Sequence, residues 1–283
     1  MPGTITPIGV GTAVLHPKQA SAGAPLDPFV APGNTNPPVI FEPPPALTGG
    51  AAELWIIATG GANWGGAQIW VSSDNATYAY AGTLYRGGRQ GVLSAALPRH
   101  ADPDNGDTLA VDLTESQGQL LSGTRGDADA FVTLCYCDGE LLSYQNATLT
   151  AQYHYNLAYL RRGVYGSPLG AHPAGSQFAR FGPNDPSLFR YAYPAGFAGA
   201  AIYLKFPAFN LFGQQLQSLA AVGATGYALL ATGLSGLGNP LLSALAAGIS
   251  QDWGSVGSGV IASADLAPVA ISTGLTITLG AVP

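Results

Sequence analysis

Two arginines and a histidine lie close together in the stretch "YNLAYLRRGVYGSPLGAH", residues 155–172. Guanidinium groups beside glycines suit an anion-binding loop, and His172 could act as a base in an active-site loop. Catalysis would also need a nucleophile held beside a base, and the stretch supplies none. We therefore interpret Arg161-Arg162-Gly163 as a corner after a strand that ends near Leu160. Gly163 is expected to take a positive φ, and the arginines to bind nearby carboxylates or carbonyls.

Acidic residues raise the question of a metal. Asp102, Asp104 and Asp107 cluster in "DPDNGD", which resembles part of a calcium loop. The regular alternation of ligands and the closing bidentate glutamate of such loops are missing, so we interpret the cluster as a solvated turn. Glu140 follows a hairpin glycine, where an exposed turn acid is expected. None of these residues is predicted to hold a metal.

Nucleophilic chemistry has no clear signature either. The sequence contains no G-x-S-x-G motif, and its histidines (His16, His100, His154 and His172) are scattered. Cys135 and Cys137 lie two apart on a predicted strand, so they share a face and are too near in sequence for an easy mutual disulfide. We expect two small core residues, because no further zinc ligands stand at a recognisable spacing. The sequence predicts no catalytic residue, cofactor or metal.

Aromatic residues could form a binding surface. Most of them alternate along predicted strands, which favours core packing and cross-strand pairing over a sugar-stacking platform. Trp64 is the exception, because it lies in the glycine-rich segment "GGANWGG", where an exposed position is expected. If the aromatic residues do form a binding surface, the candidates are Trp64 and the nearby tyrosines Tyr78 and Tyr80.

The composition excludes some classes of function. Only 9% of the 283 residues are charged, and the net charge is −6, whereas about 25% charged residues is typical. No basic stripe is available for phosphates, so we expect no nucleic-acid partner. No apolar run is long enough for stable membrane insertion. A lightly charged exterior suits subunits of permanent assemblies, which bury much of their surface against neighbours.

The order of elements predicts a mainly β fold. Short alternating runs are separated by turn signals such as Asp74-Asn75, "DPDNGD" and Asp138-Gly139, which is typical of antiparallel sandwiches or barrels. A short helical turn is expected within 122–131. The predicted parts are an extended Pro/Gly-rich arm (1–46), a β-sandwich domain (47–122), a second β domain (123–222) and a Gly/Ala-rich segment with a short helix and strands (223–283).

Several motifs in order carry a resemblance to a known family. "GELLSYQNATLTAQYHYNLAYLRRGVYGSPLGAHPAGSQFARF", residues 139–181, resembles a stretch near the end of phage tail-tip and baseplate-hub proteins. These include the host-specificity proteins of lambda-like tails and the hubs of gene transfer agents. "WGGAQIWVSSDNATYAYAGTL" resembles the preceding sandwich of those proteins. "AIYLKFPAFNLFGQQLQSL", with Asn210 and Gly213, is similar to the closing strands of a fibronectin type III-like unit. Together the motifs span roughly residues 36–222.

The resemblance implies a structural part of a virion, at the tail tip of a phage, prophage or gene transfer agent. Its partners would be other tail-tip or baseplate subunits, usually in a homotrimer, and a host surface receptor or glycan. Assembly would take place in the host cytoplasm. No catalytic residue carries over, so the resemblance implies a protein that is not an enzyme.

Two other interpretations of the sequence stay open. One is a free-standing carbohydrate-binding or adhesin-like β module that uses Trp64 and nearby tyrosines. The other is a hydrolase whose triad is dispersed among loops.

Overall fold

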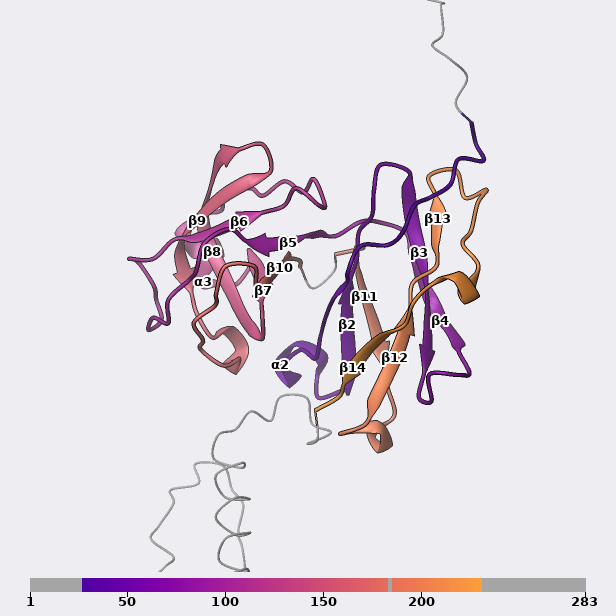
Figure 1. Ribbon diagram of the computed structural model, residues 1–283. Helices are drawn as coiled ribbons and strands as arrows, with labels where there is room; N and C mark the ends of the chain where they lie inside the picture. The colour runs from indigo at the N-terminus through magenta and orange to yellow at the C-terminus, as the bar shows by residue number, and fades with distance from the viewer. Residues whose placement is uncertain (1–26, 183–184, 231–283) are drawn as a thin grey trace, which may run out of the picture. The chain divides into compact units, whose positions relative to one another are not determined.

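The computed structural model describes residues 27–182 and 185–230 (Figure 1). The described chain is mainly β, and its sheets are antiparallel, which confirms the predicted fold class. The first 26 residues of the expected arm (1–46), the expected helix near Asn239 and the C-terminal strands expected beyond it lie outside the described residues. The end of that arm was wrongly predicted to be an unpacked linker, because Val39–Phe41 form a buried strand. In the described parts, no helix is long and apolar enough to cross a membrane.

A three-stranded sheet is built around a central strand, β2, whose sequence "ELWII" is apolar almost throughout. It pairs on one side with β1 and on the other with β11. A short helix, α2, joins the first two strands and ends at Gly49 in the left-handed conformation. The bounds are β1 (Val39–Phe41), α2 (Pro45–Thr48), β2 (Glu53–Ile57) and β11 (Leu188–Ala192).

A five-stranded sheet packs against one face of this first sheet. Leu54 and Ile56 of β2 share a buried cluster with Ile69 and Leu204 of the larger sheet, so the two sheets form a β-sandwich. The strand order is β13-β3-β12-β14, and β4 pairs with β3. The bounds are β3 (Trp64–Ser72), β4 (Ala79–Leu84), β12 (Ala201–Lys205), β13 (Ala208–Asn210) and β14 (Thr225–Ala228).

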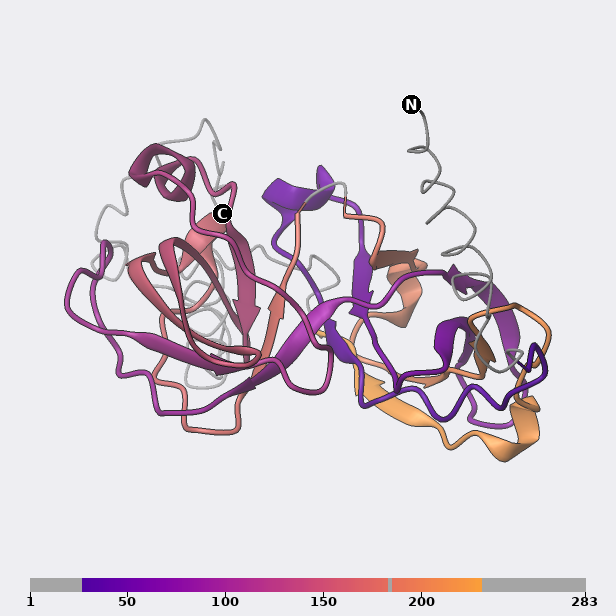
Figure 2. The same cartoon turned by 90° about the horizontal axis from the view of Figure 1, so that it is seen from above.

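Between β4 and β11 in sequence, six strands close into a barrel in the order β10-β5-β6-β9-β8-β7 (Figure 2). Closure depends on β10, which pairs with β5 on one edge and β7 on the other. The expected domain boundary at residue 122 falls inside this barrel. The bounds are β5 (Arg89–Leu93), β6 (Leu109–Asp112), β7 (Leu134–Cys137), β8 (Glu140–Ala151), β9 (His154–Arg161) and β10 (Gln177–Arg180).

Local turn chemistry matches the sequence predictions. Asp138 and Gly139 both have positive φ and join β7 to β8 as a hairpin. The expected helical turn is α3 (Arg125–Asp129), which begins with a capping box between Thr124 and Asp127. Three short 3-10 helices complete the described elements: η1 (Val164–Gly166), η2 (Ala195–Phe197) and η3 (Leu219–Ala221).

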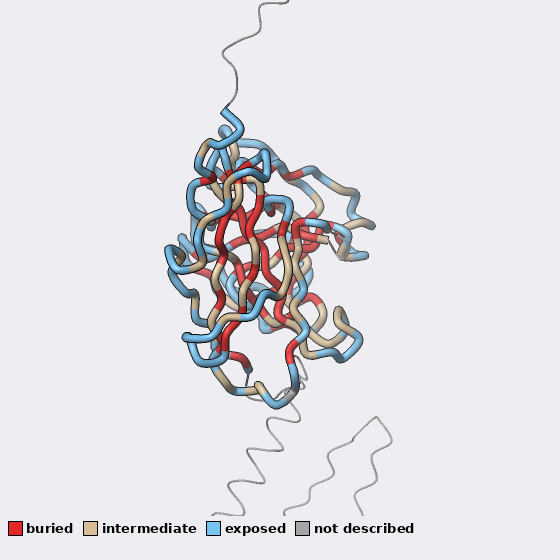
Figure 3. The backbone as a smooth tube through the Cα atoms, turned by 90° about the vertical axis from the view of Figure 1, so that its right-hand side faces the viewer, coloured by how far each residue is buried: buried red, intermediate tan, exposed pale blue. Residues whose placement is uncertain are grey.

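The sandwich strand β2 is buried on both faces. Its alternate residues, Trp55 and Ile57, join a cluster with the barrel residues Leu141 and Phe181. Trp55 and Phe181 meet edge to face, with their ring centroids 5.7 Å apart. Figure 3 shows that buried segments run through the interior of the described chain and that exposed segments lie mostly at its edges.

Candidate functional site

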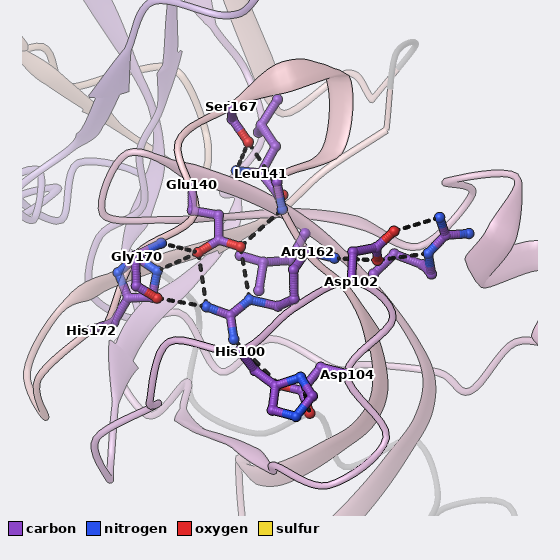
Figure 4. A network of polar contacts seen from close by, with 12 residues as sticks. His100, Asp102, Asp104, Glu140, Leu141, Arg162, Ser167, Gly170 and His172 are labelled. Atoms are coloured by element: carbon purple, nitrogen blue, oxygen red, sulfur yellow. Dashed lines mark hydrogen bonds and ion pairs between the residues drawn. The ribbon is translucent and has the colours of Figure 1, made fainter. Parts of the chain in front are cut away.

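The corner that follows β9 is the centre of a buried ionic network (Figure 4). Arg162 is buried, and its guanidinium donates to both carboxylate oxygens of Glu140. The Nε–Oε1 distance is 2.7 Å and the Nη2–Oε2 distance is 2.9 Å. Such a bidentate pair fixes the angle as well as the distance between the two groups. The expectation that the arginines of this corner bind carboxylates and carbonyls is confirmed.

Glu140 accepts further hydrogen bonds from the loop that follows the corner. The backbone N–H groups of Gly163 and Gly170 donate to it at 2.9 Å and 3.1 Å. His172 Nε2 lies 2.8 Å from Oε2, so this nitrogen carries the proton and donates to the carboxylate. The prediction of an exposed turn acid at Glu140 was wrong, because these donors and Arg162 compensate for the loss of water around its charge.

Asp104 is the second carboxylate on Arg162. Its Oδ2 lies 3.3 Å from Nη1, and both side chains are fully buried. Its Oδ1 accepts from the backbone N–H groups of Gly106 and Asp107. The expectation of a solvated turn was therefore wrong for Asp104. Its side chain is buried because it pairs with Arg162, which is distant in sequence. Two acids around one buried cation give the network an acidic excess, which backbone donors and His172 offset.

Arg161 points the other way and forms a separate, partly exposed set of contacts. It donates to both oxygens of Asp102 at 2.8 Å and 2.7 Å, and to Asp129 at 3.0 Å. The hydrogen bond from Arg161 holds the pKa of Asp102 below its usual range, and the same contact raises the pKa of Arg161. The two neighbouring arginines thus tie the corner to different parts of the barrel.

The backbone conformation of β9 explains why Arg162 is buried while its neighbour Arg161 is partly exposed. Leu157 and Leu160 both lie in the barrel core, although strict alternation would place them on opposite faces. Between them, Tyr159 takes a positive φ of 52°, which shifts the phase of β9. Arg162 is then directed inward and Arg161 outward. Gly163 follows with φ 60°, as predicted, and turns the chain into the loop.

The network has little capacity for acid–base catalysis. Burial alone would raise the pKa of Glu140, but the hydrogen bonds from His172 and Arg162 outweigh burial and lower the pKa to about 2. A carboxylate of that kind stays ionised at neutral pH, and all its acceptor positions are occupied. The Ser167 hydroxyl of the same loop accepts from the backbone N–H of Leu141 and donates to its carbonyl, so it is also bound within the protein. The arrangement locks the loop of residues 163–172 onto the hairpin of β7 and β8.

One cluster of the described chain has the composition of a metal site. Ligand atoms of His100, Asp104 and Asp107 lie within 4.8 Å of one another. Both oxygens of Asp104, however, already accept from Arg162 or from backbone N–H groups. A cation there would compete with the buried guanidinium, so the cluster does not fit a metal well.

The two cysteines are buried and unpaired, as expected for core residues. Both lie in the barrel core. Burial raises the pKa of Cys135 to about 12, and that of Cys137 is raised too. Neither thiol is therefore suited to act as a nucleophile at neutral pH.

The three candidate surface-binding residues, Trp64, Tyr78 and Tyr80, differ in their exposure. Trp64 begins strand β3 and is only 7% exposed, so its predicted exposure was wrong. Its indole packs in the sandwich core and donates to Thr35 Oγ1 at 3.1 Å, a partner that lies far away in sequence. Tyr80 is 54% exposed and meets Trp70 edge to face. Tyr78 is half-buried beneath Lys205.

Comparison with known proteins gives one match, and it coincides with the barrel. Residues 88–179 match the sequence profile of the family described as "Rcc01698-like, C-terminal". This range begins just before β5, ends within β10 and contains Glu140, Arg162 and His172. No curated protein matches the chain. The barrel with its buried network is therefore the part of this chain that is similar to a known family.

Proposed function

We propose that this protein is a structural component of the tail tip or baseplate hub of a phage, prophage or gene transfer agent. It would contribute to tail assembly and host attachment, act within a homotrimer, and have no catalytic role. The observation that carries the proposal concerns the residues of the motif that resembles tail-tip proteins, which bind within the protein. Glu140, Arg162, Gly163, Ser167 and His172 meet in one network, where they bind one another or the barrel backbone. That arrangement suits a mechanical part, which must keep its shape under force.

Exposed apolar side chains after β13 also support the proposal that this protein contacts other subunits. Large apolar side chains are exposed around the loop after β13, including Leu211 at 62%, Phe212 at 40% and Leu216 at 51%. Asn210 donates to the carbonyls of Pro28 and Val30, so the exposed Phe29 belongs to the same neighbourhood. Exposed apolar patches of this kind mark surfaces that other subunits cover. The proposed partners are copies of this chain and other tail-tip subunits.

The mass of the purified protein in solution tests this proposal. Light scattering after size-exclusion chromatography should give a trimer or a larger species. Leu211→Asp should shift that species toward the monomer, because burying a carboxylate at an apolar interface is costly. Leu149→Asp, at an equally exposed leucine of β8, is the matched control and should leave the mass unchanged. A monomer at every concentration, for the unmodified chain, would count against the proposal.

A carbohydrate-binding module is the second candidate, and it now rests on Tyr78 and Tyr80 together with Trp70, because Trp64 is buried. Trp70, Tyr80 and Tyr78 lie along β3, β4 and the turn before β4, with Lys205 of β12 over the Tyr78 ring. Aromatic faces with nearby polar groups can stack on sugar rings. Glycan-array binding that is lost on Tyr80→Ala, but kept on Tyr85→Ala at the other strongly exposed tyrosine, would favour this function.

A further inference from the structure

A pocket lined by three arginines lies away from the buried network. It has a volume of about 670 Å³ and is open to solvent. Arg86 lies in the segment between β4 and β5, Arg89 is the first residue of β5, and Arg180 is the last residue of β10. Asp185 and Ser187, just before β11, complete the polar lining. The whole chain carries only ten lysines and arginines and a net charge of −6, so three guanidinium groups around one hollow form an uncommon concentration of positive charge.

The charges in this pocket are not balanced. Among the described residues that line the pocket, Asp185 supplies the only carboxylate, and it is bound to Arg89 at 2.8 Å. Its Oδ1 also accepts from the hydroxyl and backbone N–H of Ser187. Asp185 is therefore occupied within the protein, and two of the three guanidinium groups have no carboxylate of their own.

Arg180 and Arg86 are the two uncompensated groups. Arg180 donates to the backbone carbonyls of Phe181 and Val132, at 2.6 Å and 3.1 Å, and pairs with no carboxylate in residues 27–182 or 185–230. A guanidinium has five N–H donors, so these two bonds orient Arg180 and leave further donors for a ligand. Arg86 is exposed, and nothing in the described chain binds its guanidinium.

We propose that this pocket binds an oxyanion, a carboxylate or phosphate group of a ligand, between Arg86 and Arg180. The ordered Arg180 supplies a fixed donor, and Arg86 closes on the anion from the pocket edge. Guanidinium groups match the planar, two-oxygen geometry of these anions. Arg89 is held in place by its ion pair with Asp185, which balances its charge, so the net positive charge of the pocket comes from Arg86 and Arg180. The site is separate from the Glu140 network and does not depend on the proposed tail-tip function.

Titration of the full chain with two probes tests the site and identifies the source of the anion. Isothermal calorimetry with inorganic phosphate and with glucuronate should show saturable binding of at least one probe, weakened by added salt. The tighter probe tells whether phosphate or carboxylate is preferred. Arg86→Gln should weaken that binding at least about tenfold, since a charge-assisted contact is lost while no contact within the protein is broken.

Arg99→Gln is the matched control. Arg99 is also exposed, and its substitution removes the same charge from a position outside the pocket. It should leave the affinity within about twofold of the unmodified chain. The inference is overturned if neither probe saturates, if Arg86→Gln has no effect, or if both variants weaken binding equally. The last result would mean general attraction to positive charge.

Discussion

Glu140 and Arg162 are the two side chains on which the barrel corner depends most. Each is fully buried, and each is neutralised chiefly by the other. A buried ion pair contributes little relative to an apolar pair, but removing one partner leaves a charge without compensation. This asymmetry makes single substitutions at the pair informative.

Glu140→Gln should lower the free energy of unfolding by about 3–5 kcal/mol, because the Arg162 charge stays buried with only Asp104 nearby. Urea denaturation at neutral pH measures the change. Asp107→Asn removes a nearby acid that lies outside the ion pairs and should cost less than about 1 kcal/mol. Equal losses in the two variants would show that the pair is not what stabilises the corner.

The same carboxylate predicts a pH dependence. The pKa of Glu140 is lowered from 4.5 to about 2 in the fold, so the unfolded chain takes up its proton first as the pH falls. Its stabilising contribution is complete above about pH 5 and declines toward pH 2. The stability difference between the unmodified chain and Glu140→Gln should therefore shrink across that range. A difference that stays constant from pH 6 to pH 3 would contradict the assignment.

Among the secondary-structure elements, the corner between β9 and the following loop needs a particular backbone. Gly163 has φ 60°, and an added Cβ would lie 3.1 Å from both the Ser167 carbonyl and Leu169. Gly163→Ala should cost about 1–2 kcal/mol for the left-handed conformation alone. Thermal unfolding measures the loss. Gly61→Ala is the control, since nothing lies within 4 Å of its added Cβ and its φ is not positive.

The helix α3 predicts a smaller effect. Thr124 accepts from the Asp127 backbone N–H at 3.0 Å, and Asp127 bonds back to the Thr124 backbone N–H at 2.8 Å. Thr124→Ala removes half of this capping box and should lower the free energy of unfolding by about 1 kcal/mol. Thr108→Ala, at an exposed threonine outside any helix, should change it little. If the two variants are equally stable, the cap does not contribute.

Elements with local signals could be predicted from the sequence, and long-range ones could not. Asp138-Gly139 and the Thr124 cap depend on residues within a few positions of each other, so the sequence shows them directly. Burial of Glu140 depends on Arg162 and His172, and burial of Trp64 depends on Thr35, all distant in sequence. The barrel is likewise closed by β10, which pairs with strands on both sides of the expected boundary at residue 122. The Arg162–Glu140 pair had one signal, an arginine directly before a glycine corner, but no partner could be assigned.

At the scale of the whole molecule, we propose that the barrel serves as a structural part and that other subunits cover the apolar surface after β13. The polar groups of the ionic network are bound within the chain, and in the proposal the exposed apolar side chains after β13 are the surface that other subunits cover. A protein of this kind acts through its shape and its contacts. Its place in a particle is therefore the most informative property to measure.

Gold-labelled antibody against this chain, applied to particles from cells that produce it and viewed by negative-stain electron microscopy, tests that claim most directly. The proposal predicts label at the distal end of tails, and loss of that label when Glu140→Gln destabilises the barrel. Particles that carry intact tails without label, while the chain is found elsewhere in the cells, would contradict it.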